Sequence, residues 1–129
     1  MIFSKAATLL TLLATSTAVM ATPFDKRYPL TCNGLNRHVP VNEAQACVNF
    51  IRNKGTTACM VPGENVVFCS SGSARIYGSN PNRKPNPTSH CSDVARGAQA
   101  IIDSCRQGST VGGSNAAWGN GDIIIIIAH

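Results

Sequence analysis

The segment Asp122-Ile123-Ile124-Ile125-Ile126-Ile127 contains five isoleucines in succession. β-Branched residues favour strands, and the run is shorter than a typical buried helix. A strand with one face in water alternates apolar and polar residues, and this run does not alternate. It would also promote aggregation if it lay at an open sheet edge. The segment therefore predicts a strand that is covered on both faces, in the middle of an antiparallel or mixed sheet.

A first amphipathic helix is predicted over residues 42–54. Its apolar residues follow the i, i+3, i+4, i+7 spacing of a helix with one buried face. Asn42 is the expected N-cap, and Gln45 would reach back to it in a variant of the capping box. Gly55 is the expected C-terminal stop, because glycine adopts the left-handed conformation readily.

A second helix is predicted over residues 91–106, with an apolar stripe that includes Cys105. Cys91 lies on the same side, and Cys47 lies on the apolar face of the first helix. Both helices thus carry cysteines on their inward faces. This indicates that disulfides tie the helices to the sheet.

The remaining strands are shorter. Residues 57–61 and 65–70 are expected to pair through a type II turn at Pro62-Gly63, and residues 74–78 form a third strand. Residues 108–121 are rich in Gly, Ser and Asn and are interpreted as a connection with hairpin glycines. The order β-α-β-β-β-α-β predicts an α+β fold, a small disulfide-stapled α/β sandwich of two helices on one sheet.

The N-terminal residues carry an export signal. Residues 6–19 are apolar or small and follow Lys5, and a cleavage site is expected after Ala21, which predicts a signal peptide over residues 1–21. Residues 22–27 form a pro-segment that ends in the dibasic pair Lys26-Arg27, the pattern that kexin-type proteases cut. The expected product is a secreted, extracellular single domain of residues 28–129.

Charge and cysteine content narrow the function classes. Processing would lower the net charge from the +5 of the whole chain to about +3, which falls short of the basic clusters of nucleic-acid binders. The leader is too short and too polar for a membrane span. An even number of cysteines in a small exported chain predicts three disulfides among 15 pairings: Cys32, Cys47, Cys59, Cys69, Cys91 and Cys105. No metal site or cofactor is expected.

The segments around these cysteines resemble a known family. Thr31-Cys32-Asn33-Gly34, Val67-Phe68-Cys69, Ile101-Ile102-Asp103-Ser104-Cys105 and Asn120-Gly121-Asp122 are similar to segments of the fungal KP4-like killer-toxin proteins. The resemblance implies a small secreted α/β sandwich of the kind that also occurs among candidate plant-pathogen effectors. It further implies interference with calcium channels through basic surface residues. The family often has further cysteines after the first cysteine and after the second helix, and this chain has none there.

No motif predicts an enzyme. A small secreted nuclease needs a histidine, a carboxylate and an arginine in one site, and the candidates are scattered along the chain. They are His38, Glu43, Glu64, Arg75 and His90. The segment Ser70-Ser71-Gly72-Ser73 lacks the pattern of a nucleophile elbow and is interpreted as a loop.

The polar loop over residues 80–90 is the predicted binding element, because long loops in compact domains often bind ligands. Its cations suit an anionic partner, its amides suit a glycan or a protein, and the single tryptophan suits stacking on a sugar ring. Two other interpretations stay open, a flexible connector for the loop and a core position for the tryptophan. The binding candidates are Asn82, Arg83, Lys84, Asn86 and Trp118.

These observations favour a monomeric, non-enzymatic effector or toxin-like protein. Its expected partner is a protein, channel or glycan on the surface of a host or competitor cell. One alternative is a carbohydrate-binding or cell-wall-binding module. Another, from a different class, is a small secreted hydrolase such as a ribonuclease.

The processing hypothesis predicts the mass of the secreted protein. Intact-mass spectrometry should give a chain that starts at Tyr28 and is lighter than the reduced chain by six hydrogens, one for each of its six cysteines. A chain that starts at Thr22 would contradict cleavage after Arg27.

Overall fold

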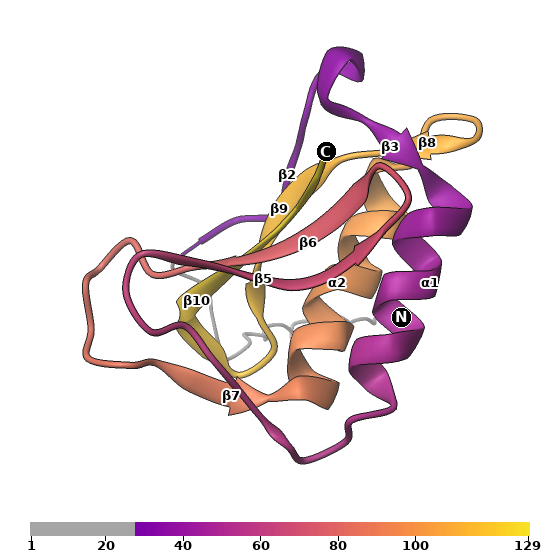
Figure 1. Ribbon diagram of the computed structural model, residues 1–129. Helices are drawn as coiled ribbons and strands as arrows, with labels where there is room; N and C mark the ends of the chain where they lie inside the picture. Colours follow the sequence, from indigo (N-terminus) through magenta and orange to yellow (C-terminus); the bar gives the residue numbers. More distant parts are fainter. Residues whose placement is uncertain (1–27) are drawn as a thin grey trace, which may run out of the picture.

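The computed structural model describes residues 28–129. The predicted signal peptide, its cleavage site at Ala21 and the dibasic pair Lys26-Arg27 lie outside the described residues. Within the described part, two helices cover one face of a five-stranded sheet (Figure 1).

The isoleucine run forms the central strand of this sheet, as the sequence predicts. The five strands pair antiparallel in the order β2-β9-β10-β6-β5. Their bounds are Thr31–Cys32 for β2, Gly113–Ala117 for β9, Asn120–Ala128 for β10, Ala74–Ser79 for β6 and Asn65–Ser71 for β5. A central position gives the backbone of β10 hydrogen-bond partners on both sides, so its apolar run is not left at an open edge.

The two faces of β10 are covered unequally. Ile123, Ile125 and Ile127 are fully buried in the core between sheet and helices. On the other face, Ile124 is 3% exposed, whereas Ile126 is only partly buried. Coverage of both faces is therefore complete only for part of the strand.

The helices are α1 (Val41–Arg52) and α2 (Cys91–Cys105), close to the predicted bounds. Their buried side chains match the predicted stripes. The first helix ends at Arg52 with Asn53 as its C-cap, and Gly55, the predicted stop, follows in the turn with a φ of 59°. The predicted cap is wrong. The helix begins before Asn42, and no side chain caps it; instead the first backbone N–H, that of Val41, donates to the carbonyl of Ser109 at 2.8 Å.

The predicted hairpin around Pro62-Gly63 is also wrong. β4 (Ala58–Met60) pairs with β7 (Thr88–His90), and β5 pairs with β6. Gly63 does have the positive φ expected of it. The N–H of Val61 donates to the carbonyl of Pro87 at 3.0 Å, which prolongs the β4–β7 ladder by one hydrogen bond. A further small ladder joins β3 (Val39–Pro40) to β8 (Thr110–Val111), and a short 3-10 helix, η2, spans Leu35–Arg37.

Strand β9 was not expected, because its sequence of small and polar residues has a low strand propensity. The close approach of α2 explains these residues. A Cβ on Gly97 of α2 would lie 2.7 Å from the carbonyl oxygen of Ala116, and one on Gly113 of β9 would lie 3.0 Å from the sulfur of Cys105. Small residues thus let α2 pack directly on the sheet.

The disulfides select one of the 15 pairings and confirm that they tie helices to strands. Each joins one helical cysteine to one strand cysteine: Cys32–Cys105, Cys47–Cys69 and Cys59–Cys91. Loops of this length predict about 3–4 kcal/mol of stabilisation for each bridge taken alone. The protein is a small disulfide-stapled α+β sandwich.

The unequal burial of the two faces of β10 can be tested by substituting two neighbouring residues of the strand, one on each face. Ile125→Ala should lower the free energy of unfolding by about 2–5 kcal/mol, because it leaves a cavity in the core. Ile126→Ala should cost less, since that side chain is partly exposed. Urea unfolding of the oxidised protein measures both, and equal losses would contradict the assigned faces.

Candidate functional site

The loop between β6 and β7, residues 80–87, is built around one buried amide; we call it the Asn80 loop. Asn80 is 3% exposed. Its Nδ2 donates to the carbonyls of Gly63 at 3.1 Å and Lys84 at 2.7 Å, and its Oδ1 accepts from the N–H of Lys84 at 3.0 Å. One side chain therefore closes the loop on itself and fastens it to the turn at residues 62–64.

The cations of the loop differ in their surroundings. Arg83 has a φ of 52° and forms an ion pair with Glu64 at 3.2 Å, in which both side chains are more than half exposed. Such exposed pairs contribute at most about 1 kcal/mol, so a ligand can displace Glu64 at little cost. Lys84 is exposed, and its backbone is fixed by Asn80.

The two predicted asparagines lie on the exposed rim of the loop. Asn82 and Asn86 are both exposed, and Asn86 has a φ of 45°. The carbonyl of Asn86 accepts from the hydroxyl of Thr88 at 3.0 Å. Left-handed conformations at Arg83 and Asn86 cost free energy unless the surroundings hold them. The loop is thus a specific, bonded structure, and a flexible connector does not describe it.

The loop is held at both ends by the core. Cys59 precedes the turn at residues 62–64, Cys91 follows β7, and the two cysteines form a disulfide. The β4–β7 ladder joins the same segments through their backbones. The loop therefore projects from a base that is cross-linked. Figure 1 shows the chain between β6 and β7 extending away from the sheet.

Trp118 lies at the same end of the sheet and is not a core residue. It is 50% exposed at the tip of the β9–β10 hairpin, and the guanidinium of Arg96 lies 5.2 Å from the centre of its ring. The backbone N–H of Trp118 donates to the backbone carbonyl of Asp93 at 3.2 Å. Asn120 Nδ2 donates to the carbonyl of Thr88 at 2.9 Å, which joins the hairpin to the end of the Asn80 loop. The fold thus brings the predicted binding residues to one end of the molecule.

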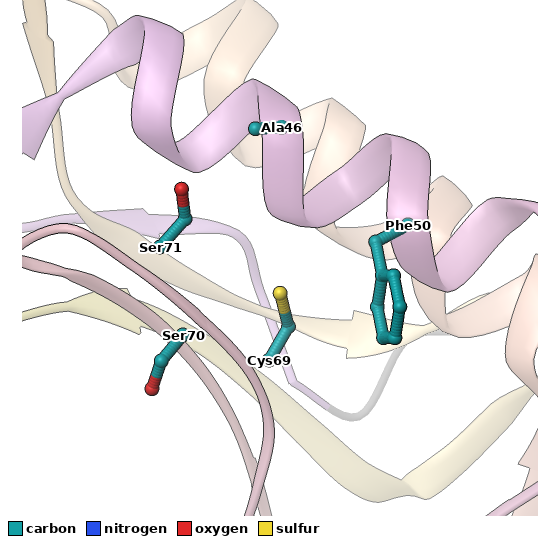
Figure 2. A pocket seen from close by; sticks show the side chains of 5 residues that line it. All are labelled: Ala46, Phe50, Cys69, Ser70 and Ser71. Carbon is teal, nitrogen blue, oxygen red and sulfur yellow. The ribbon is translucent and has the colours of Figure 1, made fainter.

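A separate groove of about 400 Å³ lies between α1 and β5. Figure 2 shows Ser71 and the Cys69 sulfur directed toward α1, with the ring of Phe50 beside them and Ser70 directed away. Ala46 completes the lining. The sulfur belongs to the Cys47–Cys69 disulfide, and the lining residues include no histidine, carboxylate or lysine that could activate a serine hydroxyl.

The histidines and carboxylates considered for a nuclease do not form one site. His38 bonds to Thr110 Oγ1 at 2.9 Å and to the carbonyl of Asn33 at 3.0 Å, beyond the C-terminal end of α2. His90 immediately precedes the N-terminus of α2. A helix of 15 residues is about 22 Å long, which separates the two imidazoles widely.

The carboxylates have structural partners. Glu43 accepts from the N–H and the hydroxyl of Ser73, which fastens α1 to the turn between β5 and β6. Arg75 is exposed on β6, and Glu64 pairs with Arg83. Within residues 28–129, no group of three or more His, Cys, Asp and Glu side chains has a metal-binding arrangement. None of the helices in that part is long and apolar enough to cross a membrane.

Comparison with known proteins places the chain in a family. The model of a family described as a domain of unknown function, DUF8794, matches residues 27–129. The chain belongs to the DUF8794 family. No curated protein and no solved structure matches it significantly. The KP4-like resemblance therefore stays a prediction.

Sequence reasoning missed two residues of this candidate site. Asn80 was not singled out, although Asn followed by Pro is a common turn former, a signal of its role in the loop. Arg96 was overlooked because its partner lies on another element, so only the fold brings guanidinium and indole together.

The role of Asn80 predicts a specific instability. Asn80→Ala removes three hydrogen bonds from a buried position and should lower the free energy of unfolding by about 1–3 kcal/mol. Limited trypsin digestion should also cut faster after Arg83, because the loop loses its anchor. Asn82→Ala is the matched control, since Asn82 is exposed; equal trypsin sensitivity of the two variants would contradict the anchoring role.

Proposed function

We propose that this protein is a secreted, non-enzymatic effector or toxin-like protein that binds a surface component of a host or competitor cell. The contact surface is the end of the sheet that carries the Asn80 loop and the tip of the β9–β10 hairpin. The observation that carries the proposal is the buried Asn80 amide, which holds an exposed cationic loop in one conformation. Pre-ordering of this kind lowers the entropy cost of binding.

The chemistry of this surface supports binding rather than catalysis. It offers cationic and amide side chains from the loop and an indole from the hairpin, with Arg96 beside the ring. Such groups recognise anions, carbonyls and sugar rings without reacting with them. The disulfides support an extracellular location, since disulfides persist in oxidising compartments.

The KP4-like resemblance supports the same reading. It implies a small secreted α/β sandwich, and the fold has two helices against an antiparallel sheet. It also implies basic surface residues, and Arg83 and Lys84 are exposed.

The proposal predicts the effect of removing both loop cations. Arg83→Ala with Lys84→Ala should reduce the response of leaf tissue, or of a competing microbe, to the purified oxidised protein. Arg37→Ala with Arg106→Ala removes the same charge from exposed positions near the opposite end of α2 and should leave the response unchanged. An intact response in the loop variant would overturn the assignment of the contact surface.

A carbohydrate-binding or cell-wall-binding module is the second candidate. The exposure of Trp118 favours it, because a half-exposed indole on a hairpin tip can stack on a sugar ring. Pull-down on insoluble chitin or glucan should then be weakened by Trp118→Ala. Phe50→Ala is the matched control, since Phe50 is an equally exposed aromatic residue on α1. If both variants were retained equally on the insoluble polysaccharide, the result would contradict a carbohydrate-binding function for Trp118.

A further inference from the structure

The five-stranded sheet has one long open edge, at β5. Within residues 28–129, β5 pairs with β6 on one side and with no strand on the other. The opposite edge strand, β2, has only two residues, and short edge strands resist further pairing. β5 has seven residues, none of them charged and none proline, so it lacks the usual side-chain protection of an edge. Its outer backbone groups can therefore bind another extended backbone.

The side chains of β5 suit pairing with a second copy of the same strand. The register to β6 shifts by one residue between Val67 and Cys69, which makes Phe68 the extra residue of a bulge. A bulge usually disturbs pairing along an edge, but this one makes the pattern of faces symmetric. Val67 and Ser70 lie on the face that turns away from the helices, and the core face carries Val66, Phe68, Cys69 and Ser71.

This symmetry defines one register. A two-fold axis between Phe68 and Cys69 sets an antiparallel second copy so that Val67 lies opposite Ser70. Partners then share a face at every position from 66 to 71, as cross-strand partners must.

The helix beside this edge has a matching shape. α1 packs on β5 and β6, whereas α2 packs on β9 and β10. Ala46 and Phe50 of α1 are exposed and line the groove along β5, with Ala46 toward the Ser71 end and Phe50 toward the other end (Figure 2). The two-fold axis exchanges these ends. The ring of Phe50, which is 54% exposed, thus turns toward the small Ala46 of the second copy.

The charges beside the groove are complementary under the same exchange. Lys54 Nζ lies 4.9 Å from the centre of the Phe50 ring, at one end of the groove. Glu43 binds Ser73 just beyond the other end of β5. In the paired arrangement, Lys54 of each copy turns toward Glu43 of the other, and charge complementarity of this kind fixes the orientation of partners. A second copy therefore fits the open backbone, the groove and the charges together.

We propose that two copies of this protein pair antiparallel through β5, which joins their two five-stranded sheets into one continuous sheet. Val67 of each copy lies opposite Ser70 of the other. The contact does not use the Asn80 loop, so it goes beyond the function proposed above. It replaces the monomeric state expected from the sequence with a two-fold symmetric dimer.

Sedimentation equilibrium of the secreted, oxidised protein tests the dimer. The mean mass should rise from that of one chain to that of two as the concentration increases from about 1 μM to about 1 mM. A mixture of isotope-labelled and unlabelled protein should show intermolecular nuclear Overhauser contacts between Val67 and Ser70. A single-chain mass throughout this range would overturn the proposal.

Charged variants test the register. Val67→Lys with Ser70→Lys puts like charges directly opposite each other and should weaken dimerisation by about tenfold or more. Val67→Glu with Ser70→Glu should have the same effect. An equimolar mixture of the two variants should dimerise again, because unlike charges then face each other across the contact.

Leu35→Lys with Asn36→Lys is the matched control, since both residues are exposed on η2. The bond of the His129 ring to the carbonyl of Asn36 puts η2 beside the end of β10, away from the β5 edge. This control should dimerise like the unchanged protein. Near-ultraviolet circular dichroism first establishes that each variant is folded. Undiminished dimerisation of the lysine variant, or a mixture of the two charged variants that stays monomeric, would overturn the β5 pairing.

Discussion

The apolar contact between one face of β10 and the two helices is the interaction on which the fold depends. Ile123, Ile125 and Ile127 are fully buried there, and each contributes about 1.5–3 kcal/mol relative to an exposed position. A domain of this size has a marginal core, so the placement of these side chains decides which sheet order is stable. The central position of β10 follows, because only there do its backbone and its core-facing isoleucines both find partners.

The parts of the fold that the sequence predicted are those in which burial leaves a local pattern. The apolar stripe of α2 and the isoleucine run of β10 are of this kind, since the residue pattern within each element shows which of its faces are buried. Strand pairing is different, because β4 has no local signal that distinguishes β5 from β7 as its partner. The small residues of β9, such as Gly113, reflect contact with α2, a distant element. Disulfide pairing depends on the same three-dimensional information.

The candidate site shows the same division. Residue types in the loop pointed to a binding surface, because cations, amides and prolines are visible in the sequence. The anchoring by Asn80 and the contact of Arg96 with Trp118 depend on how β6, α2 and the β9–β10 hairpin meet. The ion pair of Arg83 with Glu64 likewise required the turn at residues 62–64 to lie beside the loop.

The disulfide connectivity explains how a small domain holds an ordered, polar loop. The Cys59–Cys91 bridge and the β4–β7 ladder fix the segments just before the turn at residues 62–64 and just after β7. Asn80 then needs to order only the residues between these fixed points. Only a few loop residues therefore lose conformational entropy when the loop adopts its structure. The disulfide that links a helix to a strand in the core is therefore also the base of the proposed contact surface. The stability of the fold and the order of the loop are coupled through this bridge, since losing it would free both the N-terminal end of α2 and the loop that precedes it.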